Sequence, residues 1–496
     1  MAIWRRMAGK HAPPEFGINH LVALARDRPA TTLGPLERLE ALCDAGSLHV
    51  IRSEVTSRRM GEKARAGDGV IGAAGRVHGR PVFAYSQDSS FAGGSLGEQH
   101  ADTIVRVLQL AGQARAPVVG FVASAGARMQ EGVAALAGYG RIFGEHVRLS
   151  GRVPQISVIA GASAGGGSYS PALTDFIVMT RDASMFLTGP GVVREVMGED
   201  VDAAELGGPQ VHERNGVCHN VVEDDLAAAK HVRRLLSYFP QHAGQDPPAG
   251  LPVEPQPGSP ADVVPANPRK VYDVRDVLAR VLDGGELLEI QPRWARNLVT
   301  GFARLDGRPV GVLANQPRWI GGVLDADSAQ KGARFVRTCN TFNLPLLVFV
   351  DTPGFMPGTA QERSGVIRHG AKLLHAFAEG EVPKLTVVLR KAFGGAYITM
   401  NSRALGAHLS FAWPGAELGV MGARQAVGII HHRRPEHEHE ALAAEYAETH
   451  LRASVAASEG HVDELIEPGD TRARLAWGLS TLSGMELGNA KGNLPL

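Results

Sequence analysis

Cysteine, aromatic residues, net charge and long apolar runs are all scarce in this sequence. Its three cysteines, Cys43, Cys218 and Cys339, are far apart, which excludes a disulfide framework or a C-x-x-C zinc pair and fits a reducing compartment. Lysine plus arginine equals aspartate plus glutamate at 51 each, so charge gives no sign of nucleic-acid binding. No stretch approaches the ~20 apolar residues of a membrane-spanning helix. We therefore expect a cytoplasmic protein without nucleic-acid or membrane partners.

Glycine, in contrast, is abundant. The chain has 60 glycines in 496 residues, about 12% against an average near 7%. This indicates many tight turns and close backbone approaches. The hydrophobic fraction of 44% is that of a globular protein, and the length suffices for two or three domains.

One pattern is written twice along the chain. The stretch GFVASAGA, which begins at Gly120, is echoed by VFVDTPGF 228 positions later, at Val348. The stretch VPQISVIAGASAGGG is echoed by VPKLTVVLRKAFGGA, which matches Gly165 to Gly394 at a spacing of 229. A register this constant predicts a tandem duplication of whole domains.

A proline-rich segment separates the two copies. Residues 240–268 hold nine of the 30 prolines and no periodic apolar pattern, which is typical of an extended linker. We therefore predict an N-terminal extension at 1–35, a first domain at 36–239 and a second domain at 269–496.

Each copy alternates short apolar runs with amphipathic stretches. Runs such as 118–122, 156–160 and 385–389 are typical of buried parallel strands. Between runs, Val366, Gly370, Leu373 and Phe377 share one helical face. The sequence therefore predicts an α/β fold with right-handed crossovers.

The glycine turns that follow two of these strands are the candidate catalytic features. A turn that opens a helix presents unpaired backbone N–H groups at the positive end of the helix dipole, where a developing oxyanion is stabilised. We predict two such oxyanion-stabilising turns. Their residues are Gly165, Gly166 and Gly167 in the first copy and Gly394, Gly395 and Ala396 in the second.

Two other motifs compete with this interpretation. GASAG fits the G-x-S-x-G nucleophile elbow with Ser163 as nucleophile, but the matched residue in the second copy is Ala392 and no partner Asp or His stands out. The histidines between 431 and 450 suggest a metal site, but they lack H-E-x-x-H. We therefore expect an exposed, charged helix there and no metal in this chain.

Five motifs occur in an order typical of one family. They are GARMQEGV, GASAGGGSYSPALTDF, TGPGVVREVMGEDVDAAELGG, VDTPGFMPG and RKAFGGAYITMNSR. With them, from about Leu36 onward, the chain resembles the carboxyltransferase (β) subunit of biotin-dependent acyl-CoA carboxylases of the acetyl-/propionyl-CoA type.

The resemblance implies two tandem crotonase-like domains and a homo-oligomer assembled as a trimer of dimers. Acyl-CoA would bind the first domain of one protomer and face the second domain of its neighbour, where carboxybiotin enters. The carboxyl group would pass to the α-carbon, giving malonyl-CoA from acetyl-CoA or methylmalonyl-CoA from propionyl-CoA. The Gly165–Gly167 turn would serve the thioester oxygen, and the turn at Gly395 and Ala396 would serve the ureido oxygen of biotin.

The resemblance also implies partners and further binding residues. The chain lacks a biotin-attachment MKM motif and an ATP-grasp region, so it would need a biotin carboxylase and biotin carrier, commonly fused as an α subunit. We expect Arg128 to contact a CoA phosphate, with a surface ion pair as the alternative. Ile398 would tune the acyl pocket, with core packing as the alternative. The remaining substrate-binding candidates are Gly93, Gly94, Gly126, Tyr169, Gly354, Phe355 and Tyr397.

The motifs leave the direction of the reaction and the acyl chain open. A malonyl- or methylmalonyl-CoA decarboxylase of the same architecture shares them, and a serine hydrolase at Ser163 is a remote alternative.

Overall fold

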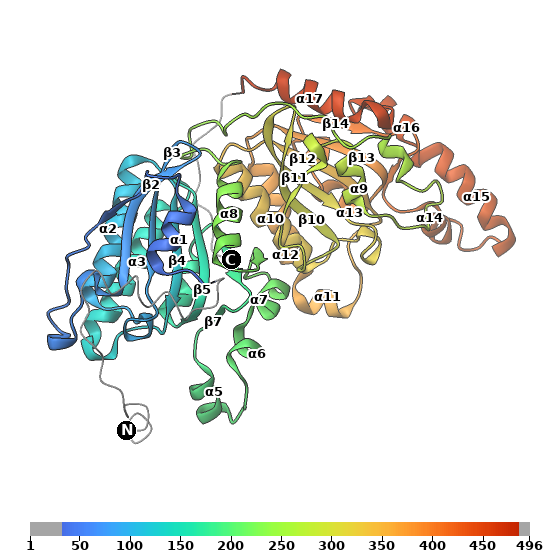
Figure 1. Cartoon of the computed structure of the whole chain (residues 1–496). Helices are drawn as coiled ribbons and strands as arrows, with labels where there is room; N and C mark the ends of the chain where they lie inside the picture. Colours follow the sequence, from blue (N-terminus) through green and yellow to red (C-terminus); the bar gives the residue numbers. More distant parts are fainter. Residues whose placement is uncertain (1–31, 486–496) are drawn as a thin grey trace.

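The computed structural model describes residues 32–485 (Figure 1). Most of the predicted N-terminal extension, residues 1–35, therefore lies outside the described residues. Helix α1 begins at Pro35, after Leu33 N–H donates to Asp225 Oδ2 at 2.9 Å.

Two sheets of eight strands form the framework, one in each half of the described chain. The first sheet has the order β1-β2-β3-β4-β5-β6-β8, with β7 paired to β5. The second has the order β16-β14-β13-β12-β11-β10-β9, with β15 paired to β13. The strands of the first sheet are β1 (His49–Ile51), β2 (Val70–Val77), β3 (Arg80–Gln87), β4 (Val118–Ser124), β5 (Gln155–Ala164), β6 (Phe176–Thr180), β7 (Ser184–Phe186) and β8 (Asn220–Val222). Those of the second are β9 (Leu288–Ile290), β10 (Leu298–Leu305), β11 (Arg308–Asn315), β12 (Leu346–Thr352), β13 (Lys384–Phe393), β14 (Leu409–Ala412), β15 (Glu417–Gly419) and β16 (Glu464–Leu465).

Helices cover the sheets in both halves (Figure 1). The first half has α1 (Pro35–Leu42), α2 (Glu98–Ala114), α3 (Val133–Leu149), α4 (Gly166–Ala172), α5 (Pro190–Met197), α6 (Ala203–Gly207), α7 (Pro209–Asn215) and α8 (Asp225–Leu236). The second has α9 (Val274–Ala279), α10 (Ala326–Thr341), α11 (Thr359–Ser364), α12 (Val366–Glu379), α13 (Gly394–Thr399), α14 (Ala423–Ile430), α15 (His439–Tyr446), α16 (Ala453–Ser458) and α17 (Thr471–Thr481). On α12 the four predicted core residues are all buried.

The two sheets repeat each other strand by strand. In each, an antiparallel three-stranded edge leads into parallel strands. The register also repeats, because Val118 pairs with Gln155 in the first sheet and Leu346 with Lys384 in the second. These offsets of 228 and 229 are those of the sequence repeat. The predicted duplication and the α/β fold are confirmed.

An aromatic cluster joins the two halves into one core. The Phe239 ring contacts Phe176 of β6 at a centroid distance of 5.4 Å and Phe302 of β10 at 5.0 Å, both edge to face. Phe239 also lies 5.4 Å from Phe342, just after α10. Edge-to-face pairs add about 0.5–1.5 kcal/mol each to the burial of their area, so the halves pack as one body.

The proline-rich segment contacts both halves, since Ala243 N–H donates to Arg152 O at 2.9 Å in the first half. Apart from the short η8 (Pro260–Asp262), residues 240–268 form no helix or strand. Gly250 N–H donates to Gly307 O at 2.7 Å, in the turn between β10 and β11. The segment is thus fixed by contacts of its backbone.

Candidate active site

The two predicted glycine turns lie at the ends of β5 and β13, at equivalent places in the two sheets. Gly165 precedes α4 with φ 57° and ψ −119°, a region closed to residues with a Cβ. Gly394 begins α13 with φ 60°. The following amides belong to the first turn of a helix, where no intrahelical acceptor exists. Each turn therefore has the backbone form that the sequence predicts.

The two turns differ in what demands glycine. A Cβ on Gly166 would lie 2.5 Å from the Tyr139 ring, and one on Gly167 would lie 2.8 Å from Ser163 Oγ. In the second turn, a Cβ on Gly395 would meet nothing closer than the Phe355 ring at 3.9 Å. Gly395 also lacks a positive φ. Neither packing nor backbone strain therefore explains why residue 395 is a glycine. Unlike Gly166 and Gly167, Gly395 faces open space.

A second loop supports each turn. Gly126 and Gly354 follow β4 and β12, and each accepts a hydrogen bond from a leucine amide, Leu96 N at 2.8 Å and Leu324 N at 3.0 Å. These leucines follow the short turns η6 (Ala92–Gly94) and η10 (Ile320–Gly322).

Close backbone contacts hold these loops beside the strand ends. A Cβ on Gly94 would lie 2.0 Å from Ala123 O, and a Cβ on Gly126 would lie 3.5 Å from Ala164 O, next to the first turn. The candidates Gly93, Gly94 and Gly126 thus lie together beside the Gly165 turn.

The candidate side chains of the second turn are placed by α13 and the β12 loop. Phe355 lies beside Gly395, and Ala396 is fully buried. Tyr397 is partly buried, whereas Ile398 is 46% exposed, which excludes core packing as the reason for an apolar residue there. The matched residue of the first half, Tyr169, is 52% exposed.

The first-half and second-half candidates therefore form two groups in different sheets. Both groups lie at strand ends, as the sequence predicts. Because they belong to different sheets, the sharing of one site between two protomers stays a prediction.

Arg128 does not have the role predicted for it. Its side chain is fully buried, with Nη1 2.5 Å from Asp68 Oδ1 and 2.9 Å from Glu131 Oε1. Nη2 donates to the backbone oxygens of Asp68 and Ser95 at 3.2 and 3.0 Å. The Arg128 Nε has no hydrogen-bond partner but is buried with the rest of the side chain, so the guanidinium is not accessible to a CoA phosphate. The surface ion pair is equally wrong. Arg128 instead ties three loops of the first half together.

The acids around Arg128 are built into the same loops. Burial is the largest influence on the pKa of Asp68 and raises it, against the hydrogen bond and charge of Arg128. Burial also opposes the charged form of Glu131, but hydrogen bonds from Glu98 N, Ser57 and Arg128 outweigh it and lower that pKa. The sequence contained no signal for this cluster, because Asp68 lies 60 positions before Arg128.

A comparable cluster lies at the strand ends of the second half. Asp351 Oδ2 is 3.0 Å from Arg390 Nε and accepts a hydrogen bond from Tyr272 Oη at 2.9 Å. Its Oδ1 has no hydrogen-bond partner and lies 4.0 Å from Lys391 Nζ. Burial raises the pKa of Asp351. The cluster joins β12 to β13 just before the loops that carry Gly354 and Gly394.

Ser163 lacks the surroundings of a nucleophile. It is fully buried, and its hydroxyl donates to Gly167 O at 2.8 Å, inside the first turn. The hydroxyl thus stabilises the turn, and the hydrolase interpretation is not supported.

We expect Ser163→Ala to keep carboxyl transfer within about fivefold, because it removes one neutral hydrogen bond worth about 1 kcal/mol. A fluorophosphonate probe should leave the wild-type chain unlabelled. Stoichiometric labelling with loss of transfer would restore the nucleophile elbow.

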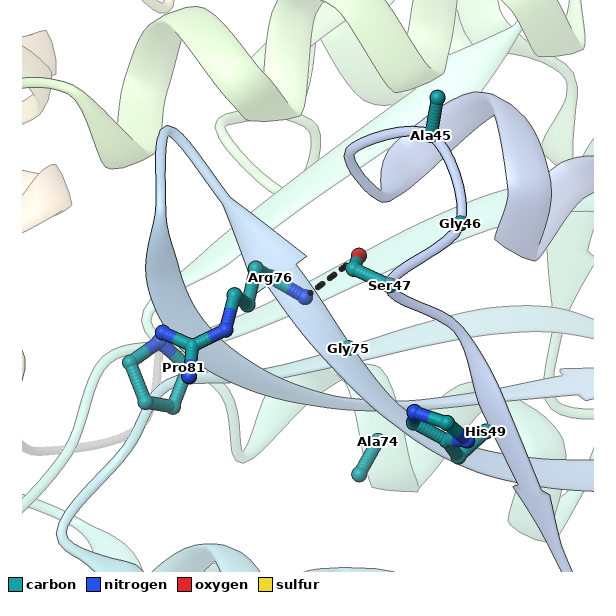
Figure 2. A pocket seen from close by; sticks show the side chains of 8 residues that line it. All are labelled: Ala45, Gly46, Ser47, His49, Ala74, Gly75, Arg76 and Pro81. Atoms are coloured by element: carbon teal, nitrogen blue, oxygen red, sulfur yellow. Dashed lines mark hydrogen bonds between the residues drawn. The ribbon is translucent and has the colours of Figure 1, made fainter.

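Other candidate sites are less developed. The predicted exposed helix is only partly formed, because of the five histidines between 431 and 450 only His439 lies in the mostly exposed α15. His437 lies in a short 3-10 turn and His450 in a π-helical turn. Residues 32–485 contain no group of three or more His, Cys, Asp or Glu that could hold a metal. A hollow of about 460 Å³ lies at the outer edge of the first sheet, where Ser47 Oγ accepts from Arg76 N at 3.1 Å (Figure 2). None of the predicted site residues lines it.

The described helices include none with both the length and the apolar character needed to cross a membrane.

Comparison with known proteins identifies the family of this fold and these turns. The carboxyl transferase domain model matches residues 26–486. The chain is 47% identical to the propionyl-CoA carboxylase carboxyltransferase subunit of Haloferax mediterranei, over 93% of each chain. It is 46% identical to the mitochondrial propionyl-CoA carboxylase β chain of Homo sapiens, over 91% of this chain and 85% of the human one.

A solved structure agrees. The transcarboxylase 12S hexamer with bound methylmalonyl-coenzyme A and methylmalonic acid matches with a TM-score of 0.91 and 44% identity, over 94% of this chain and 93% of that one. The two sheets are therefore those of a crotonase-like carboxyltransferase with two domains. The chain belongs to the carboxyl transferase domain family and is a carboxyltransferase of the acyl-CoA carboxylase type.

Proposed function

We propose that this chain transfers a carboxyl group between biotin on a separate carrier protein and the α-carbon of a short-chain acyl-CoA. The observation that supports biotin binding at the second turn is the open space above Gly395. Glycine in a helix costs about 1 kcal/mol relative to alanine, and neither strain nor packing explains it there. Close approach of a ligand to the Gly395 and Ala396 amides does.

The residues of the two turns fit the two charges that such a transfer develops. Carboxybiotin supplies the carboxyl group and leaves a ureido nitrogen able to accept the α-proton. The amides at Gly395 and Ala396 would stabilise charge on the ureido oxygen, and those at Gly166 and Gly167 would stabilise charge on the thioester oxygen. Oxyanion donors of this kind contribute about 2.7–4 kcal/mol each.

The proposed site is completed by a second copy of the chain. The first half displays the exposed apolar side chains Tyr169, Leu187, Val196 and Met197, and the second half displays Ile398, Val420, Ile429 and Ile430 at the equivalent positions. Two faces related by duplication can cover each other in a head-to-tail dimer, which would bring the two turns together. We propose a trimer of such dimers with a biotin carboxylase and carrier subunit as partner.

The carboxyl transfer itself can be tested without that partner. Methylmalonyl-CoA or malonyl-CoA is incubated with the chain and biocytin, and the decarboxylated thioester is quantified by chromatography. We expect product that depends on biocytin. Equal product with and without biocytin would contradict the proposal.

The same biotin-linked step also occurs in the opposite direction. Relatives at 46% and 44% identity are a methylmalonyl-CoA carboxyltransferase 12S subunit and a methylmalonyl-CoA decarboxylase subunit alpha. A decarboxylase thus remains the alternative, and isolation of the chain's native complex with either a biotin carboxylase or a membrane subunit would separate the two.

Ile398 should set the size of the acyl group. It is half exposed next to the biotin-side turn, and a branched apolar side chain there favours a short, uncharged acyl chain. We expect Ile398→Ala to raise kcat/KM for butyryl-CoA relative to propionyl-CoA about tenfold, the usual worth of one methylene in a pocket. A carboxylation series over acetyl-, propionyl- and butyryl-CoA checks this. An unchanged ratio would remove Ile398 from the acyl pocket.

A further inference from the structure

Four exposed arginines lie close enough to influence one another, and one of them stacks on an indole of the second half. We call them the arginine cluster: Arg214 of α7, Arg293 and Arg296 between β9 and β10, and Arg318 just after β11. At the centre, the Arg296 Cζ lies 3.3 Å from the centroid of the Trp319 ring. The elements come from both halves, and α7 lies where the halves meet (Figure 1).

The arginine cluster is only partly neutralised. Arg293 lies 3.4 Å from Glu213 and Arg318 lies 3.5 Å from Asp273, and both arginine side chains are more than 60% exposed. Within residues 32–485, neither Arg214 nor Arg296 forms an ion pair. Slight burial and the neighbouring arginines, Arg293 first among them, lower the pKa of Arg296. Since the whole chain has a formal net charge of zero, this is a local concentration of positive charge.

At the equivalent position of the first half, the arginines around the aromatic ring are neutralised by acids. At the repeat offset of 228, Trp319 corresponds to Phe91, which lies 5.7 Å from Arg65 and 5.3 Å from Arg128. There the cations meet acids, because Arg128 binds Asp68 and Glu131.

The second half does not keep this arrangement of charges. Arg296 stands where the first half has the acid Asp68, and Met356 stands where it has Arg128. Both halves thus have an arginine over the aromatic ring, but only the arginine of the first half is paired with acids. A buried internal network has become an exposed cationic surface.

The loop that carries Trp319 adjoins the loop beside the biotin-side turn, because Leu324 N–H donates to Gly354 O at 3.0 Å. Trp319 leads directly into η10, and Gly322 approaches Asp351 O so closely that a Cβ would lie 2.4 Å away. Asp351 in turn precedes the loop of Phe355, the side chain nearest Gly395.

We propose that the arginine cluster binds acidic side chains that flank the biotinylated lysine of the carrier protein. The inference rests on the proposed function, which places carrier-borne biotin at the turn beside this loop. Guanidinium groups suit carboxylates because their donors match both oxygens, and stacking on Trp319 fixes one of them in advance. Several exposed cations would steer an acidic partner and make its binding depend on salt.

The test compares three probes as carboxyl acceptors from methylmalonyl-CoA. They are biocytin, a short peptide whose biotinyl-lysine is flanked by glutamates, and the same peptide with glutamines. For the wild-type chain we expect a KM for the glutamate peptide about tenfold below that for the glutamine peptide at low salt. The difference should vanish at about 0.5 M salt, where charges are screened within about 4 Å.

Charge reversal assigns the effect to the arginine cluster. The variant Arg293→Glu/Arg296→Glu/Arg318→Glu should lose or invert the preference for the glutamate peptide, with the KM values for biocytin and acyl-CoA unchanged within about twofold. The matched control, Arg106→Glu/Arg115→Glu/Arg181→Glu, changes three exposed arginines of the first half and should keep the preference.

Each other outcome overturns the inference in a distinguishable way. Equal KM values for the two peptides in the wild type would exclude an acidic partner. A raised KM for acyl-CoA alone would assign the cluster to CoA phosphates, and a raised KM for biocytin would assign it to biotin itself. Loss of the oligomer would make it a contact between copies. If wild-type chain failed to use biocytin, the proposed function would fall, and this inference with it.

Discussion

Replacing Arg128 with methionine is expected to destabilise the first half by about 3–5 kcal/mol, the usual cost of leaving a buried charge without its partner. Arg128 is fully buried between Asp68 and Glu131, and methionine is the residue at the equivalent position, 356, of the second half. Thermal unfolding should show a midpoint lower by roughly 10 °C.

Two further variants separate the charge effect from simple loss of packing. Adding Asp68→Asn and Glu131→Gln to Arg128→Met removes the unpaired acids and should recover much of the lost stability. Breaking the exposed pair between Arg181 and Glu223 by Arg181→Met should cost less than about 1 kcal/mol. A triple variant no more stable than Arg128→Met would show that the buried charges are not the cause.

The same variant tests the corrected role of Arg128. If Arg128 bound a CoA phosphate, its loss would abolish any preference for CoA esters over the corresponding dephospho-CoA esters. We expect that preference to be the same in Arg128→Met as in the wild type, at a temperature where both are folded. A lost preference would reinstate the contact with CoA.

Replacing single glycines of the two turns is expected to lower carboxyl transfer by at least about 10², the usual scale for losing one oxyanion donor. Gly395→Ala introduces a methyl group that meets only the Phe355 ring at 3.9 Å, so the fold should be as stable as the wild type. The methyl group instead fills the approach to the turn. The KM for acyl-CoA should stay within a few-fold, and transfer to biocytin should fail.

Gly165→Ala should produce the opposite pattern of binding. Its φ of 57° with ψ of −119° costs a residue with a Cβ about 1–3 kcal/mol, so the turn would rearrange and misplace the Gly166 and Gly167 amides. Productive acyl-CoA binding should weaken. Gly140→Ala, in α3 where a Cβ would meet nothing within 4 Å, is the control for glycine replacement and should keep full activity. Failure of acyl-CoA binding in Gly395→Ala alone would reverse the assignment of turns to substrates.

Periodic and repeated features of this fold could be predicted from the sequence because they depend on local patterns. Apolar runs predicted the parallel strands β4, β5 and β13, and the constant offset predicted two equivalent sheets. The glycine run at 165–167 predicted a turn. It could not show that Gly165 alone takes the positive φ while Tyr139 and Ser163 exclude a Cβ at the next two positions.

Long-range charge pairing could not be predicted in the same way. Arg128 reads as an exposed arginine in a loop until Asp68 and Glu131 close around it, and Asp68 reaches it through a left-handed backbone turn with φ 49°. Likewise, nothing local relates Arg296 to Trp319, 23 positions later. Only the fold shows that the arginine over the aromatic ring is paired with acids in the first half and exposed in the second.

The most direct test of the central claim, a site shared between the first half of one protomer and the second half of another, is complementation between Gly165→Ala and Gly395→Ala. The two inactive variants are unfolded together, or expressed together, and allowed to form mixed oligomers. In a head-to-tail dimer with one chain of each kind, one site carries both changes and the other carries neither. We predict that the mixture recovers about one quarter of wild-type transfer, while each variant treated alone stays inactive. A mixture that forms mixed oligomers and yet stays as inactive as its components would contradict the shared site.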